Sequence, residues 1–248
     1  MTSFSPRRLG GIALAVLACA AAGGMIYAAA PDYDAARAAM VQSLRKSGIR
    51  DERVLDAMGR VPRHLFVLEA NRASAYQEAE VCAGCQEVVL SPHAVAVMLE
   101  SLRPPQKGTV LEVGLRSGYE TALLAELSDR VFTVESRRKV AVVAKDRLHT
   151  LRYEAVQVRV ADGLHGWSEK APFDAILVTF PVERLPETLL DQLAEGGRWV
   201  FALGSGPEQT LNRVEKINGR LKSEIVATAR LLPAAATSRR REGGRRGR

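Results

Sequence analysis

The sequence predicts an α/β fold: a doubly wound, mostly parallel β-sheet with helices on both faces. The first observation is an alternation of short apolar runs with segments of helical spacing between residues 110 and 203. The second is a glycine-containing turn, Glu112 to Tyr119, placed between an apolar run and a helix-like segment. The third is the pair Asn218-Gly219, which separates two strand-like segments and is typical of a β-hairpin.

The elements follow from apolar spacing and from helix and strand boundary signals. Helices are predicted at 32–47, 51–58, 92–102, 120–127, 139–151 and 187–193. Strands are predicted at 110–113, 131–134, 156–160, 175–179 and 199–203, with a closing hairpin that pairs 211–217 with 221–230. Gly48 separates the first two helices, and Pro104 follows the third. The stretch around Cys82 and Cys85 is expected to be a loop.

The charge of the chain is concentrated at its ends. The net charge is +7, yet the tail 239–248 holds six arginines against one glutamate, and Arg7 and Arg8 add two charges at the start. Residues 31–238 are therefore close to neutral. A nucleic-acid-binding domain is expected to carry a basic face of its own, so no nucleic-acid partner is predicted.

The chain is expected to have three parts, namely a leader at 1–30, one folded domain at 31–232 and a basic, disordered tail at 233–248. The leader places two arginines before an apolar stretch that ends in three alanines, which is the pattern of a secretory signal or of an uncleaved anchor. An alanine-rich soluble helix, with a cytoplasmic domain, is the alternative. Leader and tail could each contact a membrane.

Cys82 and Cys85 form a Cys-Ala-Gly-Cys sequence. A zinc site would need a second ligand pair, so no metal is predicted. In an exported protein a local disulfide is the favoured interpretation, and two free thiols are the alternative.

Several short motifs occur in order along the domain. They are Val-Pro-Arg-His-Leu-Phe-Val at 61–67, Ala-Tyr at 75–76, the stretch 110–119, Val-Phe-Thr-Val-Glu at 131–135, Ala-Asp-Gly at 161–163, the stretch 171–179 and Gly-Gly-Arg at 196–198. Together they resemble the protein-L-isoaspartate O-methyltransferases between about residues 51 and 232. The resemblance implies a Rossmann-like class I methyltransferase fold, S-adenosyl-L-methionine (AdoMet) as cofactor, and an isoaspartyl protein or peptide as substrate.

Cofactor contacts are predicted at the ends of successive strands. Glu135 ends the second strand of the alternation about twenty residues after the glycine turn, where an acidic side chain can accept both ribose hydroxyls. A solvated strand-end charge is the alternative. The resemblance implies that Asp162 and Gly163 meet the adenine, although Asp-Gly is also an ordinary turn. The predicted cofactor residues are Glu112, Gly114, Gly118, Glu135, Asp162 and Gly163.

The chain departs from the family in two loops. Arg116 replaces the middle glycine of the cofactor turn; it should crowd the cofactor, unless its side chain turns outward or binds a carboxylate. Where the family reads close to Gly-Gln-Thr-Ile-Ser-Gln-Pro, this chain has Val88 and Leu90 in place of the hydroxyl residues. Ser91 and His64 are the candidate catalytic residues, with His64 equally readable as a packing residue.

The leading hypothesis is therefore an AdoMet-dependent protein-L-isoaspartate carboxyl methyltransferase that repairs isoaspartyl residues. A catalytically degenerate binding or scaffold protein outside the cytoplasm is the alternative, favoured by the two altered loops and the leader. A methyltransferase for another substrate is the third hypothesis. The sequence leaves the oligomeric state open.

Overall fold

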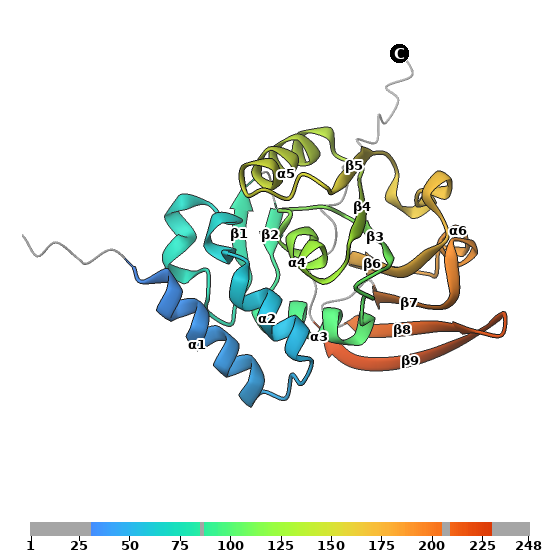
Figure 1. The fold of residues 1–248 in the computed structure, drawn as a ribbon, viewed down its shortest axis with the longest axis horizontal. Helices are drawn as coiled ribbons and strands as arrows, with labels where there is room; N and C mark the ends of the chain where they lie inside the picture. The colour runs from blue at the N-terminus through green and yellow to red at the C-terminus, as the bar shows by residue number, and fades with distance from the viewer. Residues whose placement is uncertain (1–30, 85–86, 205–208, 230–248) are drawn as a thin grey trace, which may run out of the picture. The chain divides into compact units, whose positions relative to one another are not determined.

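The computed structural model describes residues 31–84, 87–204 and 209–229 (Figure 1). The predicted leader, the whole predicted tail and Cys85 lie outside the described residues, so the predictions of export, tail disorder and a Cys82–Cys85 disulfide stay predictions. Within the described ranges, no helix is both long and apolar enough to cross a membrane.

A seven-stranded sheet with the order β5-β4-β3-β6-β7-β8-β9 forms the centre of the domain. Its strands are β3 (Thr109–Val113), β4 (Arg130–Glu135), β5 (Gln157–Val160), β6 (Phe173–Val182), β7 (Leu193–Leu203), β8 (Gln209–Ile217) and β9 (Arg220–Ala229). The pairs from β5 to β7 are parallel, and β8 and β9 are antiparallel. The predicted doubly wound, mostly parallel sheet is confirmed.

The order of the strands creates a switch point beside β3. From β3 the chain moves outward to β4 and β5, and then returns to β6 on the other side of β3. In open α/β sheets, ligands bind in the crevice outside the carboxyl ends of the strands at such a point. The predicted cofactor residues lie at or just beyond the carboxyl ends of β3, β4 and β5.

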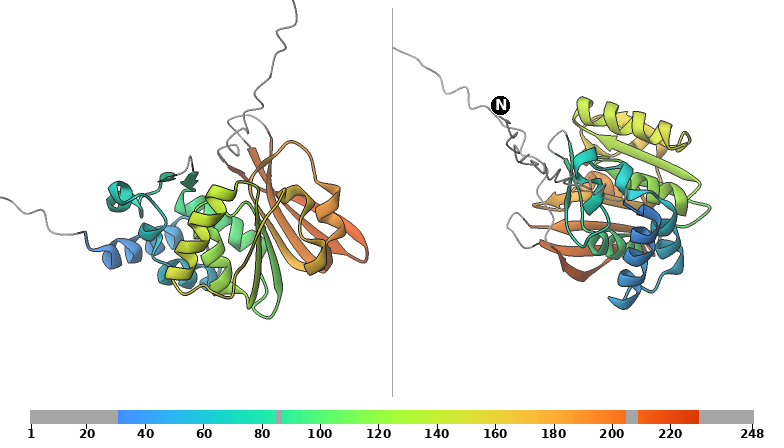
Figure 2. Two further views of the ribbon diagram at one scale, coloured as in Figure 1. Left: turned by 90° about the horizontal axis from the view of Figure 1, so that it is seen from above. Right: turned by 90° about the vertical axis from the view of Figure 1, so that its left-hand side faces the viewer.

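The helices cover the two faces of the sheet unequally. They are α1 (Tyr33–Lys46), α2 (Glu52–Arg60), α3 (Pro92–Leu102), α4 (Tyr119–Leu127), α5 (Arg138–Thr150) and α6 (Glu187–Asp191), with short 3-10 helices at Arg63–Leu65, Glu69–Ser74, Gly163–His165 and Ser168–Lys170. Neighbouring residues of β3 point to opposite faces: Val110 packs with α1–α5, whereas Leu111 packs with Trp199 and with Leu189 of α6. Figure 2 shows the blue-to-green helices gathered on one side of the strands.

Two hairpins flank this framework. Asn218 and Gly219 have φ of 51° and 70°, as a two-residue type I′ turn requires, and they join β8 to β9 as predicted. The stretch expected to be a loop instead forms an antiparallel pair, β1 (Val81–Gly84) with β2 (Glu87–Val89). Strands of four and three residues are too short to give a readable alternation, although their apolar ends Val81 and Val89 are buried.

One predicted boundary is wrong. The helix expected at 187–193 ends at Asp191, because Leu193 already belongs to β7 and pairs with Phe173 of β6.

Candidate active site and cofactor loop

The turn between β3 and α4 uses the left-handed backbone conformation three times. Gly114 has φ 97°, Arg116 has φ 50°, and Gly118, the N-cap of α4, has φ 87°. A Cβ at Gly114 would lie 2.5 Å from Oγ1 of Thr179, so glycine is required there by space as well as by conformation. The predicted Gly114 and Gly118 therefore shape a tight turn at the carboxyl end of β3.

Glu112 lies beneath this turn and is fully buried. Its Oε2 accepts hydrogen bonds from the hydroxyls of Thr121 (2.5 Å) and Thr133 (2.7 Å), which tie β3 to α4 and β4. Its Oε1 has no hydrogen-bond partner in the described part of the chain. Burial raises the pKa of Glu112 from 4.5 to about 8, although the two hydroxyls oppose this shift. Glu112 thus supports the turn from below.

The raised pKa of Glu112 makes stability depend on pH. Between about pH 4.5 and 8 the folded state holds a proton on this carboxyl that the unfolded state has lost. The resulting contribution to stability is complete below pH 4.5 and is lost as the pH rises towards 8. We expect Glu112→Gln, which cannot ionise, to lose less stability than the natural protein between pH 6 and 8. Urea unfolding at pH 6 and pH 8 measures the free energy of unfolding of each protein, with exposed Glu154→Gln as control. An equal change in this free energy in Glu112→Gln and the natural protein would contradict the prediction.

Glu135 ends β4 and presents a buried carboxylate to the turn. It accepts a hydrogen bond from the backbone N–H of Arg116 at 3.3 Å. It also accepts from the backbone N–H and from Nε of Arg137, both at 3.0 Å. The carboxylate predicted to meet a ribose is therefore already paired with an arginine.

The side chain of Arg116 turns inward and is 7% exposed. Its guanidinium donates to the carbonyl of Thr179 at 2.7 Å and to the carbonyl of Val88 at 3.1 Å. Its Nε lies 3.5 Å from a carboxylate oxygen of Glu87. Arg116 thereby joins the cofactor turn to β2 and β6. Of the outcomes expected for Arg116, the structure shows the one in which its side chain binds a carboxylate. Its backbone is left-handed, which strains a non-glycine residue by roughly 1 kcal/mol.

Glu87 completes a charged bridge of four residues: Arg116, Glu87, Arg137 and Glu135. Glu87 is 6% exposed and also pairs with Arg137, so it binds both arginines. A small cavity of about 10 Å³, enough for about one water molecule, remains between β2, the turn and α5. Sequence analysis missed Glu87 and Arg137, because only the β1–β2 hairpin brings Glu87 over the turn.

Asp162 and Gly163 follow β5. One carboxylate oxygen of Asp162 caps the short helix Gly163–His165 by accepting from the N–H of Leu164 at 3.0 Å, and the other lies 3.3 Å from His165. A Cβ at Gly163 would lie 2.4 Å from Cγ1 of Val113, so this glycine permits close packing against β3. The structure therefore places both residues beside the strand end that carries Glu135.

Ser91 and His64 have separate local partners. The Ser91 hydroxyl caps α3 by accepting from the N–H of Ala94 at 3.3 Å. His64 bonds through Nδ1 to the Tyr76 hydroxyl at 2.8 Å and stacks on Tyr33 at a centroid distance of 4.0 Å. Burial, with nearby arginine charges, lowers the pKa of His64. Within the described residues, no hydrogen bond or ion pair joins Ser91 to His64.

A glycine turn after β3, an acidic residue at the end of β4 and a closing antiparallel hairpin define the class I methyltransferase fold. Solved structures share it. One, a protein-L-isoaspartate O-methyltransferase, is 26% identical with a TM-score of 0.70, and the match covers 80% of this chain and 65% of that one. Another, described as a beta-aspartate methyltransferase from Plasmodium falciparum with S-adenosyl-L-homocysteine, is 22% identical with a TM-score of 0.67, covering 79% and 97%.

Sequence comparisons give the family. The model of the family protein-L-isoaspartate(D-aspartate) O-methyltransferase (PCMT) matches residues 35–239. Protein-L-isoaspartate O-methyltransferase 2 of Geotalea uraniireducens is 46% identical over 78% of this chain and 90% of the relative. The protein of the same name from Syntrophobacter fumaroxidans is 41% identical over 92% and 98%. The chain belongs to the protein-L-isoaspartate(D-aspartate) O-methyltransferase family.

Proposed function

We propose that this protein methylates the α-carboxylate of isoaspartyl residues in proteins or peptides, with AdoMet as the methyl donor. Membership of the family supports the reaction. The observation that carries the proposal in the structure is the buried carboxylate of Glu135 beside the glycine turn at the switch point of the sheet. This arrangement presents a ribose acceptor and a helix N-terminus in one place.

The backbone around the turn fits AdoMet, and one side chain must move. Gly114, Gly118, Glu135, Asp162 and Gly163 would hold the cofactor, with Glu112 supporting the turn. The Arg137 side chain pairs with Glu135 but is 27% exposed, so it has a path outward. Bound AdoMet supplies an electrophilic methyl group on its sulfonium sulfur.

The residues of the chain act mainly by positioning. A substrate carboxylate is already ionised near pH 7 and needs no general base, so the orientation of the two reactants dominates the rate. Leu90 cannot donate the hydrogen bond of the serine that the family has there, and Ser91 is held in the cap of α3. We therefore propose a slower enzyme than is typical of the family.

The direct test is transfer of a labelled methyl group by the full-length protein to an isoaspartyl peptide, with the matching aspartyl peptide as control. We expect base-labile methyl ester on the isoaspartyl peptide alone, at less than about one turnover per second. AdoMet binding without methylation of either peptide would favour another substrate. Absence of AdoMet binding would favour a scaffold, which the charged bridge across the turn also supports.

Arg116→Gly is expected to bind AdoMet about tenfold more tightly, a gain of about 1.4 kcal/mol. Glycine tolerates φ near +50° and removes the guanidinium from the turn. Calorimetric titration measures the dissociation constant. Arg152→Gly is the matched control, because Arg152 has φ 67° and lies at the exposed end of α5. Weaker binding by Arg116→Gly would identify Arg116 as a cofactor contact.

We further propose that the leader carries the domain out of the cytoplasm, where it would act on extracytoplasmic proteins. The two arginines followed by an apolar stretch ending in alanines support this proposal. A reporter enzyme fused after residue 30 should be active only outside the cytoplasm; activity confined to the cytoplasm would reject it.

A further inference from the structure

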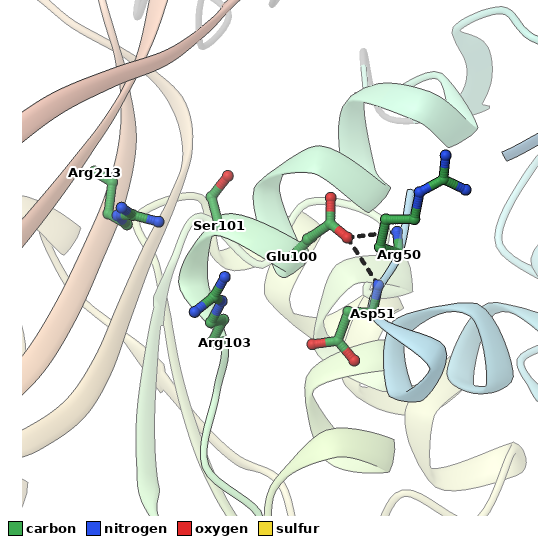
Figure 3. A pocket seen from close by; sticks show the side chains of 6 residues that line it. All are labelled: Arg50, Asp51, Glu100, Ser101, Arg103 and Arg213. Atoms are coloured by element: carbon green, nitrogen blue, oxygen red, sulfur yellow. Dashed lines mark hydrogen bonds between the residues drawn. The ribbon is translucent and has the colours of Figure 1, made fainter. Parts of the chain in front are cut away.

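A second cavity lies at the far end of α3 from the active-site loop. It has a volume of about 420 Å³ and is lined by Arg50, Asp51, Glu100, Ser101, Arg103 and Arg213 (Figure 3). These residues come from the α1–α2 connection, the last turn of α3 and β8. Three arginines against two carboxylates give the lining a net positive charge.

The two acidic residues of the lining are already satisfied. Glu100 accepts hydrogen bonds from the backbone N–H groups of Arg50 at 2.6 Å and Asp51 at 2.8 Å. Asp51 caps α2 through the N–H of Arg53 and lies 3.4 Å from the guanidinium of the same residue. These hydrogen bonds hold both carboxylates against the start of α2.

The arginines retain hydrogen-bonding capacity. Figure 3 shows the Arg103 and Arg213 side chains on the same side of α3 as Ser101, with Arg50 on the other side of Glu100. The guanidinium of Arg213 forms an ion pair with Glu224 at 2.7 Å. The Arg103 guanidinium has no hydrogen bond or ion pair to any residue that the structure describes. The full positive charge of Arg103, which has no ion-pair partner among the described residues, exceeds the partial negative charge of the α3 C-terminus, about half an elementary charge.

The backbone at Arg103 points to a role for its side chain. Arg103 ends α3 with φ 47° and ψ 59°, a left-handed cap at which glycine is the unstrained residue. Pro104 follows directly and prevents the helix from continuing. An arginine in a strained cap, unpartnered and facing a cavity, is an observation from which function can be inferred.

The cavity is distinct from the cofactor site. Ser91 caps α3 at the end next to β2, and twelve residue steps along the helix separate it from Arg103 by about 18 Å. Arg103 also precedes β3, whereas the cofactor turn follows that strand. A ligand here would not compete with AdoMet.

We propose that this cavity binds the phosphate group of a small phosphorylated ligand. A phosphate dianion has enough acceptor oxygens to receive bonds from two guanidinium groups and a hydroxyl together. Arg103, Arg213 and Ser101 supply these donors from two different elements. The proposal does not depend on the methyltransferase activity.

Titration of the full-length protein with pyrophosphate, followed by calorimetry and by amide NMR, tests this proposal. We expect saturable binding with shifts at Ser101 and Arg103 that exceed those at Gly114 and Gly118. Arg103→Gly should weaken binding at least about tenfold. Because glycine relieves the strained cap, this variant should fold and melt no lower than the natural protein.

Arg152→Gly is again the matched control, since it removes an equal charge and a similar backbone strain from a site outside the cavity. It should leave pyrophosphate binding unchanged. The proposal is overturned if binding does not saturate below about 10 mM. It is equally overturned if the two glycine variants lose the same affinity, or if the shifts centre on the cofactor turn.

Discussion

Glu135→Ala should weaken AdoMet binding by about 100-fold, or about 2.7 kcal/mol. In the proposed function the buried carboxylate accepts both ribose hydroxyls, and a hydrogen bond to a charged group contributes roughly 1.5–3 kcal/mol. The free energy of two such bonds is partly offset by the loss of the ion pair between Arg137 and Glu135, which must break before the ribose can bind Glu135. Calorimetric titration of the variant against the natural protein gives the ratio of dissociation constants.

The control for Glu135→Ala is Glu154→Ala, which removes an exposed carboxylate beyond the end of α5. It should bind AdoMet with unchanged affinity. Thermal unfolding establishes that both variants are folded. A loss of less than threefold at Glu135, in a folded protein that binds AdoMet, would mean that the ribose is held elsewhere.

Arg63→Leu should destabilise the domain by roughly 3–5 kcal/mol, which is a large part of an ordinary domain stability. Arg63 is fully buried, and its guanidinium donates to the carbonyls of Ala75 at 2.5 Å and Leu90 at 2.6 Å. Leucine fills similar space but donates nothing, so two buried carbonyls lose their partners at roughly 1–3 kcal/mol each. Urea unfolding measures the difference.

Arg60→Leu is the comparison, because Arg60 is 55% exposed and forms a surface ion pair with Glu126. It should cost less than about 1 kcal/mol. Similar losses in the two variants would show that the hydrogen bonds of Arg63 to Ala75 and Leu90 do not stabilise the domain. Since Arg63 holds the carbonyl before Ser91, its loss should also raise KM for the peptide.

The strands and the closing hairpin were predictable because each is indicated by residues that are close together in the sequence. Buried parallel strands are continuous apolar runs, as in Thr109–Val113, and a pair such as Asn218-Gly219 selects a two-residue hairpin turn by its backbone preference alone. The cap that Ser91 provides for α3 was not predicted, because Ser91 was considered only as a candidate catalytic residue.

The charged bridge was not predictable, because its members are brought together only by tertiary structure. Glu87 and Arg137 are fifty residues apart, and their contact depends on a hairpin whose strands are too short to show a period. The direction of the Arg116 side chain is likewise set by the carbonyls of Val88 and Thr179, which belong to distant strands. The sequence analysis predicted crowding by Arg116 but could not identify the partners that hold its side chain.

With Glu135 in its proposed role at the ribose, its pairing with Arg137 would make cofactor binding an exchange reaction. The measured affinity is then a difference between two free energies: that of the ribose on Glu135 and that of the arginine it displaces. A modest dissociation constant would therefore not mean a poor nucleotide site. Because Glu87 retains Arg137 through a second ion pair, the displaced guanidinium stays close and can return when the cofactor leaves. The tether would shorten the residence time of spent cofactor and so favour turnover.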